Sequence, residues 1–385
     1  MEQLVTSEFK LGIAAGGQLG KMLVLAASNW DVKTYILDKD ENCPASANCT
    51  RFFKGDPMDF DDLYNFGQKV DMLTFEIELL NTKALKKLKS EGKRIIPDPE
   101  HLEMIQDKGL QKDFYRDHDI PTAPYRLFDS RDEILTAMKS GKLRPPFVQK
   151  LRTGGYDGRG VAVIRTSNGK EDLLDGPSVV EDLVDIEKEI SVISARNAMG
   201  EMVSFPSVEM EFNPEANLVD KLICPSSLTE KENAQAIKIA EQLISQLDFT
   251  GLLAVEMFMD QQRRILVNEI APRPHNSGHH TIESIITSQF EQLLRSIFNF
   301  PLGSTQIKTP AVMINLIGED GQEGKVRYVG LTESMGIQGV KFHLYGKKIT
   351  RPYRKMGHVT VMAPSIAEAR EKADIIKQIL KVRAW

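Results

Sequence analysis

The stretch LLAVEMFMDQQRRILVNEI, residues 252–270, decides the fold of this chain. Two apolar segments flank a polar turn centred on Gln262 and Arg263, and this pattern predicts a β-hairpin. Glu256 and Glu269 lie equally far from the centre of that turn. We therefore expect the two carboxylates to face each other across the paired strands, on one side of the sheet.

Two facing carboxylates in an apolar hairpin are unfavourable unless a cation lies between them. Like charges directly opposite each other destabilise a strand pair, and apolar neighbours such as Val255 and Ile270 keep water away. A bridging divalent cation removes the repulsion, and hard oxygen ligands favour Mg²⁺ when phosphates complete its coordination. The alternative is an exposed pair on an edge strand. In a regular strand Asn268 points to the other face, so it joins this site only through a bulge.

A glycine-rich segment, Arg152–Gly160, lies between two predicted strands, 147–151 and 161–165. It lacks the Gly-Lys-Ser/Thr ending of a P-loop. Its glycines allow backbone N–H groups to face an anion and allow the loop to move as a lid, and Lys150 adds positive charge. The alternative is a flexible hairpin with basic side chains. We favour the anion-binding interpretation, because so many glycines in one loop carry an entropic cost.

Two later segments carry further candidates. APRPHNSGHH, residues 271–280, is stiffened by two prolines, and His275 is a candidate proton shuttle because its unperturbed pKa lies near neutrality. The segment 346–358 concentrates lysines and arginines that suit a phosphate, arginine through paired hydrogen bonds. A basic surface turn is the alternative for this second segment.

The N-terminal region begins a parallel α/β sheet. A strand over 10–15 leads into the loop Gly16–Gly20 and a helix, and the next strand ends at Asp38. This pattern resembles a dinucleotide-binding fingerprint whose first glycine is replaced by Ala15. Two interpretations stay open: a ligand cradle at a helix N-terminus, as in an NAD-dependent oxidoreductase, and a tight strand–helix turn.

Composition narrows the class of protein. The chain has 385 residues and a net charge of −5, which favours neither nucleic acid nor an anionic membrane as a partner. No apolar run approaches the roughly 20 residues needed to span a bilayer. Cys43, Cys49 and Cys224 cannot all pair, so we expect reduced thiols in a cytoplasmic protein.

Together these motifs resemble the 5-(carboxyamino)imidazole ribonucleotide synthase family of the ATP-grasp superfamily. The resemblance covers essentially the whole chain, and its most specific parts are Arg152–Gly160, Asn268–His279, Val312–Gly318 and Arg351–His358. It implies an α/β and α+β protein with an ATP-grasp fold. Its implied parts are a Rossmann-like N-terminal domain (1–100), an ATP-grasp domain (101–305, with a lid at about 122–186) and a small C-terminal domain (306–385). It also implies a homodimer.

The resemblance also implies the site residues. ATP would contact Lys108, Lys150, Gly155, Tyr156, Asp157, Gly158, Arg159, Gly160, Val161, Glu181, Asp182, Leu183, Val184, Glu189, Asn268 and Glu269. The aminoimidazole ribonucleotide and carboxyphosphate would contact Gln18, Glu76, Tyr156, Asp157, Arg159, Arg273, His275, Lys347 and Arg354. The catalytic residues would be Lys150, Asp157, Arg273 and His275, and the metal ligands Glu256 and Glu269, holding Mg²⁺ or Mn²⁺.

The implied activity is carboxylation of 5-aminoimidazole ribonucleotide with bicarbonate and ATP, through carboxyphosphate, in purine biosynthesis. Two positions depart from the family pattern: Phe212 replaces a usual His, and Leu79 replaces a usual Asn. A formate-dependent transformylase of the same superfamily and a non-catalytic ATP-sensing protein remain as alternatives to test.

Overall fold

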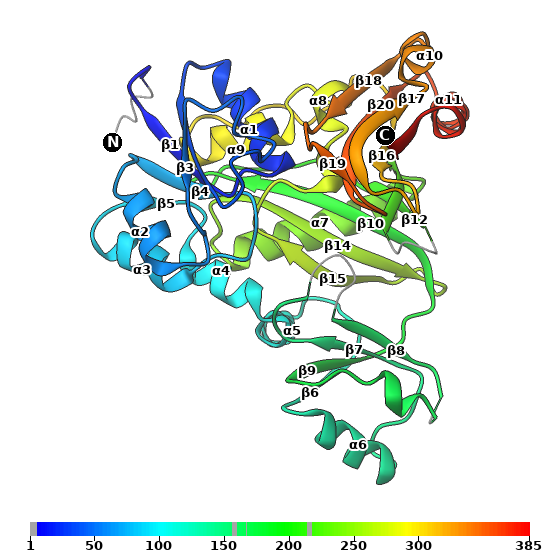
Figure 1. Ribbon diagram of the computed structural model, residues 1–385. Coiled ribbons are helices and arrows are strands. Elements are labelled where there is room, and N and C mark those ends of the chain that lie inside the picture. Colours follow the sequence, from blue (N-terminus) through cyan, green and yellow to red (C-terminus); the bar gives the residue numbers. More distant parts are fainter. Residues whose placement is uncertain (1–5, 156–159, 167, 214–217) are drawn as a thin grey trace.

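The structure is a computed structural model that describes residues 6–155, 160–166, 168–213 and 218–385. These residues form four sheets. In Figure 1 the N-terminal sheet lies at the upper left, the largest sheet runs through the centre, a small C-terminal sheet lies at the upper right, and the fourth sheet lies at the bottom. Within these ranges, no helix combines the length and the apolar character that crossing a membrane requires. The predicted Tyr156, Asp157, Gly158 and Arg159 lie outside the described residues.

The N-terminal part is a parallel five-stranded sheet with the order β3-β2-β1-β4-β5. This confirms the predicted parallel α/β start of the chain. Helices α1, α2 and α3 follow β1, β3 and β4 respectively. The elements are β1 Lys10–Ala14, α1 Gln18–Ser28, β2 Lys33–Asp38, β3 Arg51–Lys54, α2 Phe60–Gly67, β4 Met72–Phe75, α3 Thr82–Ser90 and β5 Arg94–Ile95.

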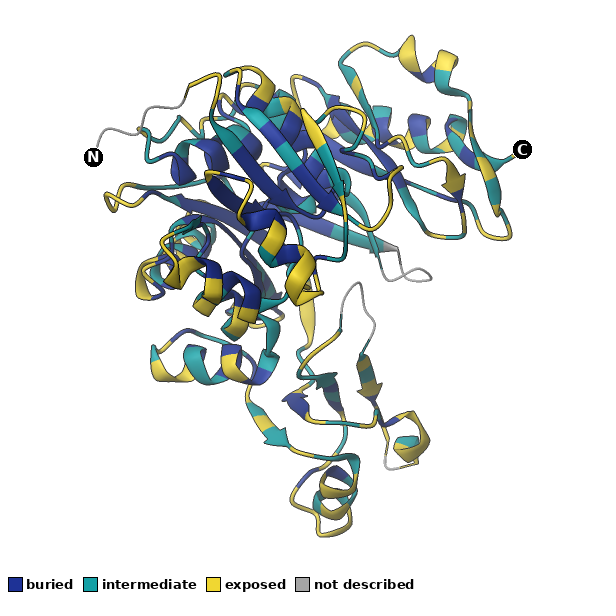
Figure 2. Ribbon diagram, turned by 60° about the vertical axis from the view of Figure 1, so that its left-hand side comes forward, coloured by how far each residue is buried: buried dark blue, intermediate teal, exposed yellow. Residues whose placement is uncertain are grey.

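A nine-stranded sheet runs through the centre of the molecule in the order β15-β14-β10-β12-β13-β16-β20-β18, with β11 paired to β10. Alternate residues of β10 and β14 pack against the long helix α7, which begins with a capping box formed by Thr229 and Glu232. Figure 2 shows these central strands as the most buried part of the fold. The elements are β10 Ile186–Arg196, β11 Met202–Ser204, β12 Val208–Asn213, β13 Leu218–Cys224, α7 Glu230–Gln246, β14 Gly251–Asp260, β15 Ile265–Ala271, α8 Thr281–Ser284 and α9 Gln289–Ile297.

The C-terminal strands continue this central sheet, because β16 pairs with both β13 and β20. A small three-stranded sheet, β19-β17-β21, lies beside them. The predicted division of the chain at 305/306 therefore falls before a strand of a continuous sheet, and the three domain boundaries stay predictions. The elements are β16 Ala311–Ile317, β17 Gly324–Val329, α10 Leu331–Met335, β18 Val340–Leu344, β19 Ile349–Thr350, β20 Lys355–Met362, α11 Ile366–Ile379 and β21 Lys381–Ala384.

The lid sheet, β6-β9-β7-β8, extends away from the other sheets at the bottom of Figure 1. Its core is small, and much of its surface is exposed or intermediate (Figure 2). The chain enters this sheet from α5, before β6, and leaves it after β9 for β10 of the central sheet. The elements are β6 Tyr125–Phe128, α6 Arg131–Lys139, β7 Phe147–Leu151, β8 Val161–Ile164 and β9 Ser178–Asp182.

The sequence pattern also predicts helices over about 101–118 and over 366–382, and both predictions were wrong in extent. The helix expected over about 101–118 is two helices, α4 Pro99–Gln106 and α5 Lys108–Asp117, because Asp107 has an extended backbone and caps α5. The helix expected over 366–382 ends at Ile379, and β21 follows because its pairing with β17 satisfies the backbone.

Candidate functional site

The β14–β15 hairpin places Glu256 directly opposite Glu269, which confirms the prediction that the two carboxylates face each other. The route differs from the one expected. Near the turn, Met257 pairs with Val267, so a regular ladder would bring Asn268 opposite Glu256. The register shifts between Glu256 and Met257, making Asn268 the extra residue of a β-bulge. The bulge restores the pairing of the two acids. It is also the irregularity through which Asn268 was expected to join this site.

Three lysines converge on this face of the hairpin. Lys108, at the start of α5, binds the Glu269 carboxylate, and Lys150 of β7 lies 2.7 Å from the Asn268 side-chain oxygen. Lys150 also lies 3.0 Å from Glu181 of β9. Lys112, one turn after Lys108, lies 3.1 Å from the same buried Glu181. Three ammonium groups therefore lie close together here, and their N–H groups could donate to the oxygens of an anion such as a phosphate chain.

The charges of this group depend on one another. Burial alone raises the pKa of Glu181, but Lys150 and Lys112 outweigh it and hold that pKa below its ordinary value. Burial also raises the pKa of Glu269, yet Lys108 lowers it overall, to about 2. Burial lowers the pKa of Lys112 to about 8. Lys112 was missed by the sequence analysis, although its i, i+4 spacing from Lys108 on a helix places both on one face.

A third carboxylate shares the face of the facing pair. Glu189 and Ser191 are two apart on β10, and Ser191 pairs with Glu256, so all three point to the same side of the sheet. Burial, together with the nearby Glu256, raises the pKa of Glu189 to about 7. The resemblance implies that Glu189 contacts the ribose hydroxyls of ATP, and this contact stays a prediction.

The segment after β15 brings Arg273 and His275 to the same region. His275 Nε2 lies 3.1 Å from the Glu256 carboxylate, and its Nδ1 lies 2.9 Å from the Ser277 hydroxyl. Arg273 forms a 2.6 Å ion pair with Glu78, at the carboxyl end of β4 in the N-terminal sheet. Ser277 and Glu78 were not among the residues predicted from the sequence, because they meet their partners only in the fold.

The N-terminal and C-terminal parts meet at a second group of predicted residues. Lys347 Nζ lies 3.1 Å from the Gln18 side-chain oxygen and 2.8 Å from the Lys355 carbonyl. Burial, followed by the neighbouring Arg354, lowers the pKa of Lys347 to about 8. Arg354 donates a 2.6 Å hydrogen bond to the Ile349 carbonyl.

The N-terminus of α1 holds a side chain of the protein itself. Glu76 is buried, and its carboxylate accepts hydrogen bonds from the Gly17 and Gly20 N–H groups. Asp38 accepts the Gly16 N–H at 2.7 Å. Burial raises the pKa of Glu76 to about 7. The Glu76 carboxylate thus takes N–H groups that a dinucleotide phosphate would need, so the structure favours the tight-turn interpretation over an oxidoreductase.

The other predicted residues follow the lid. Gly155 and Gly160 flank the undescribed part of the glycine-rich loop, and Val161 begins β8. Leu183 and Val184 lie in the connection between the lid sheet and β10. The described ATP-binding candidates thus come from α5, the lid sheet and the central sheet. Of the ribonucleotide candidates, Gln18 and Lys347 link the N-terminal and C-terminal parts through their hydrogen bond.

The donor set fits a cation that phosphates help to hold. Among the residues that the structure describes, no group of three or more His, Cys, Asp or Glu side chains is placed to bind a metal. The facing pair Glu256 and Glu269 offers hard oxygen ligands, and in this structure Glu256 contacts His275 and Glu269 binds Lys108. A Mg²⁺ ion there would need oxygen ligands from a bound phosphate chain.

Comparisons with known proteins agree with this arrangement. Three family models match in order along the chain: a ribonucleotide synthetase preATP-grasp domain at 9–106, an ATP-grasp domain at 113–290, and a phosphoribosylaminoimidazole carboxylase C-terminal domain at 311–372. The N5-carboxyaminoimidazole ribonucleotide synthase of Aquifex aeolicus is 34% identical over 96% of this chain and 97% of its own length. The chain belongs to the N5-carboxyaminoimidazole ribonucleotide synthase family.

Further relatives extend the comparison. The phosphoribosylaminoimidazole carboxylase of Saccharomyces cerevisiae is 35% identical over 95% of this chain, which covers 66% of that longer protein. The structure of the N5-carboxyaminoimidazole ribonucleotide synthetase of Thermotoga maritima is 41% identical, with a TM-score of 0.90 over 98% of this chain and all of that one (100%). The Aspergillus clavatus synthase, solved with ADP and 5-aminoimidazole ribonucleotide, is 30% identical, with a TM-score of 0.86 over 97% of this chain and all of that one (100%).

The two departures from the family pattern lie in different surroundings. Phe212, on β12, is partly buried and packs against the largest hydrophobic cluster. Leu79 follows β4 and is 41% exposed, one residue after the Glu78 that binds Arg273. The Phe212 ring thus fills space with apolar contacts where a histidine would offer a polar one.

Proposed function

We propose that this protein carboxylates 5-aminoimidazole ribonucleotide with bicarbonate at the expense of ATP, giving 5-carboxyaminoimidazole ribonucleotide, ADP and phosphate in purine biosynthesis. The observation that carries the proposal is the facing pair Glu256 and Glu269, with Lys108, Lys150 and the Asn268 bulge on the same face. Membership of the N5-carboxyaminoimidazole ribonucleotide synthase family supports the substrate class.

ATP is proposed to bind between the lid sheet and the central sheet. Lys150 and Lys108 would turn from Asn268 and Glu269 to the phosphates, since each ammonium has three donors. Glu189 would accept the ribose hydroxyls. The glycine-rich loop would cover the phosphates with backbone N–H groups and exclude water, which protects a labile acyl phosphate from hydrolysis.

Mg²⁺, or Mn²⁺ in its place, would be held by Glu256 and Glu269. When bound, such an ion neutralises the charge that develops on the transferring phosphoryl group. The protein's own contribution is geometric: the bulge fixes both carboxylates on one face and brings Asn268 beside them. Fixed charges of this kind need no rearrangement during the reaction, which is why they stabilise a transition state well.

The second half of the site is proposed to receive bicarbonate and the ribonucleotide. Bicarbonate would attack the γ-phosphorus to form carboxyphosphate, which Arg273 and His275 would hold. His275 is oriented for proton transfer by Ser277 and lies next to Glu256. Lys347 and Arg354 would bind the ribonucleotide and position its amine for attack on the carboxyl carbon.

Two further parts of the proposal concern the protein in the cell. We expect a homodimer, as is typical of the family, and a place in the cytoplasm, where the three free cysteines stay reduced. Size-exclusion chromatography with light scattering measures the first, and a monomer at micromolar concentration would contradict it.

The decisive assay is ADP release from purified protein with Mg-ATP. Release should require both 5-aminoimidazole ribonucleotide and bicarbonate, and the product should contain the carbon of labelled bicarbonate. Glycinamide ribonucleotide with formate should give no turnover. Equal turnover with that second pair would contradict the proposal and favour the formate-dependent transformylase, and nucleotide binding without any turnover would favour an ATP-sensing protein.

A further inference from the structure

The tip of the β14–β15 hairpin lies beside one of the two connections between the lid sheet and the central sheet. β9 ends at Asp182 and β10 begins at Ile186, so the connection is short. The Gln261 N–H donates a 3.1 Å hydrogen bond to the Asp185 carbonyl, and Asp260 pairs with Ile186. The turn of the hairpin therefore holds the point where the chain leaves the lid.

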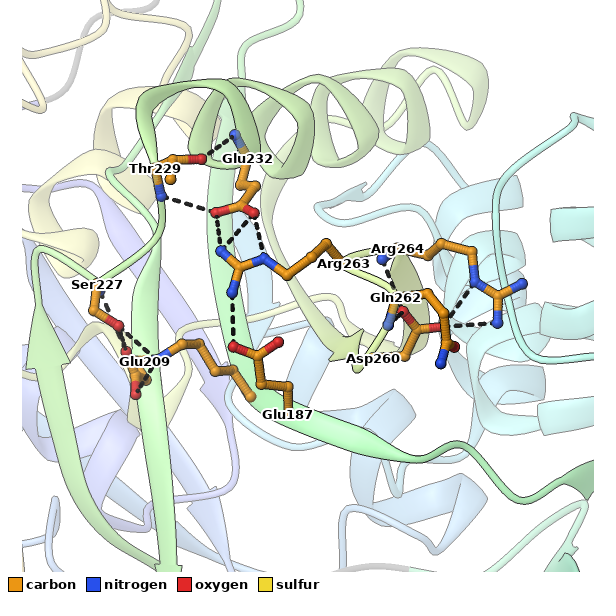
Figure 3. Close-up of polar contacts among 10 residues, drawn as sticks. Glu187, Glu209, Ser227, Thr229, Glu232, Asp260, Gln262, Arg263 and Arg264 are labelled. Atoms are coloured by element: carbon orange, nitrogen blue, oxygen red, sulfur yellow. Dashed lines mark hydrogen bonds and ion pairs between the residues drawn. The ribbon is translucent and has the colours of Figure 1, made fainter.

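Arg263 strengthens this attachment with three hydrogen bonds. Its Nε and Nη2 each lie 2.7 Å from the Glu232 carboxylate in the first turn of α7. Its Nη1 lies 2.6 Å from Glu187, the second residue of β10 (Figure 3). The neighbouring Arg264 points the other way and binds only Asp260 of its own turn among the contacts drawn in Figure 3.

The Glu232 side chain that Arg263 binds is itself held in place. It belongs to the capping box of α7, where its carboxylate accepts the Thr229 N–H at 2.9 Å. Only about 13% of its side chain is exposed, so the pair is partly shielded from water. The planar guanidinium binds Glu232 through two N–H groups and Glu187 through a third, and a lysine has no such planar fork.

The same hairpin also holds the other connection of the lid. The Val267 N–H donates a 2.7 Å hydrogen bond to the Pro121 carbonyl, and the Thr122 hydroxyl donates one of 2.7 Å to the Val267 carbonyl. Both connections are therefore hydrogen-bonded to the element that carries Glu256 and Glu269. The hairpin is therefore one of the elements that position the lid relative to the facing carboxylates, together with α5.

We propose that Arg263 is a positioning residue for the nucleotide. Through Glu187 and Glu232 it fixes the connection between β9 and β10 relative to the facing carboxylates. This connection carries Leu183 and Val184. Arg263 itself lies at the hairpin tip and is 42% exposed, so it acts through this connection. The inference rests on the proposed function, because it takes Leu183 and Val184 as the edge that binds the base. Loss of the fork leaves the connection with more conformations, of which only some bind nucleotide.

The test compares Arg263→Ala with Arg264→Ala, a matched loss of an arginine from the same turn. Mg-ADP binding is measured by isothermal titration calorimetry, and hydrogen exchange is followed over 182–187. Arg263→Ala should weaken Mg-ADP binding by up to about tenfold, or 1.4 kcal/mol, and speed exchange in that segment. Glu187→Gln should change both in the same direction by less, and Arg264→Ala should change neither. The KM for 5-aminoimidazole ribonucleotide should stay the same in Arg263→Ala.

The outcomes separate the two proposals. Wild-type protein that binds no Mg-ADP would overturn the proposed function and this inference with it. If wild-type protein binds Mg-ADP and Arg263→Ala binds it equally well, the inference alone is overturned, whatever the change in melting temperature. Equal losses in Arg263→Ala and Arg264→Ala, or unchanged exchange over 182–187, would also overturn it, since the effect would not act through the connection.

Discussion

Replacing Glu269 by Gln separates the role of the facing carboxylates in folding from their role with nucleotide. Side chains directly opposite on antiparallel strands have Cβ atoms about 5 Å apart. At an effective dielectric constant of about 20, two unit charges at that distance repel by roughly 3 kcal/mol. Glu269→Gln removes this repulsion from Glu256 and also removes the ion pair with Lys108. The two losses offset each other, so the free energy of unfolding should change by only about 1 kcal/mol.

The effect on turnover should be far larger. Removing a residue that only supports a metal ligand already lowers metal affinity or activity about 10- to 100-fold. Loss of a ligand oxygen itself should therefore reduce ADP release at least about 100-fold. A matched control is Glu209→Gln, a buried acid of the same sheet that pairs with Ile190 and so lies on the opposite face.

The assay is ADP release at saturating Mg-ATP, with urea unfolding of each variant in parallel. The expected result is a folded Glu269→Gln protein with little activity and an active Glu209→Gln protein. A Glu269→Gln variant that keeps more than half of the wild-type rate would refute the reasoning, and so would a loss of activity explained by unfolding.

Three further predictions follow from the charges of the site and the buried histidines. Lys112→Met should destabilise the protein by roughly 1–3 kcal/mol in urea unfolding, because buried Glu181 then loses one of its two lysine partners and keeps Lys150. Adding Glu181→Gln should restore part of the lost free energy of unfolding. A double variant in which the effects of the two substitutions simply add would contradict this. Since the pKa of Lys347 is about 8, the KM for 5-aminoimidazole ribonucleotide should rise above pH 8 as the ammonium loses its proton. Lys347→Arg should abolish this rise. The same pH profile of KM in the wild type and in Lys347→Arg would argue against a contact between Lys347 and the ribonucleotide. Burial lowers the pKa values of His279, His280 and His358, that of His280 to about 3, so the unfolded chain binds protons below pH 6.5 that the folded chain does not. The free energy of unfolding should thus fall as the pH drops below 6.5, by at most about 1.4 kcal/mol per pH unit for each histidine. In His358→Asn this fall should be shallower. An unchanged slope of the free energy of unfolding against pH would be inconsistent with a buried neutral His358.

The hairpin shows how far sequence reasoning reaches. Apolar runs around a polar turn were enough to predict the strands and the pairing of Glu256 with Glu269. The bulge at Asn268 was not predictable, because it depends on backbone geometry that the residue pattern does not encode. Near the turn, the paired residues are centred one half-residue before the predicted centre of the turn. The extra residue of the bulge corrects this shift, so Glu256 and Glu269 still lie opposite each other.

Residues that act through long-range contacts were harder to find. Glu78 meets Arg273 only because the N-terminal sheet packs beside the central sheet, and Glu181 meets Lys112 across two elements. The break at Asp107 was missed for a related reason: the side chain caps α5 and also binds Arg152, at the base of the glycine-rich loop. Such residues gain their role from neighbours that are distant in the chain, so local periodicity does not reveal them.

The most direct test of the central claim is a crystal structure with Mn²⁺ and ADP, in which anomalous scattering locates the metal. We expect an anomalous peak bonded to carboxylate oxygens of both Glu256 and Glu269 and to the ADP phosphates, with the lysines turned toward the same phosphates. A peak held by phosphates alone, or by side chains elsewhere, would contradict the account.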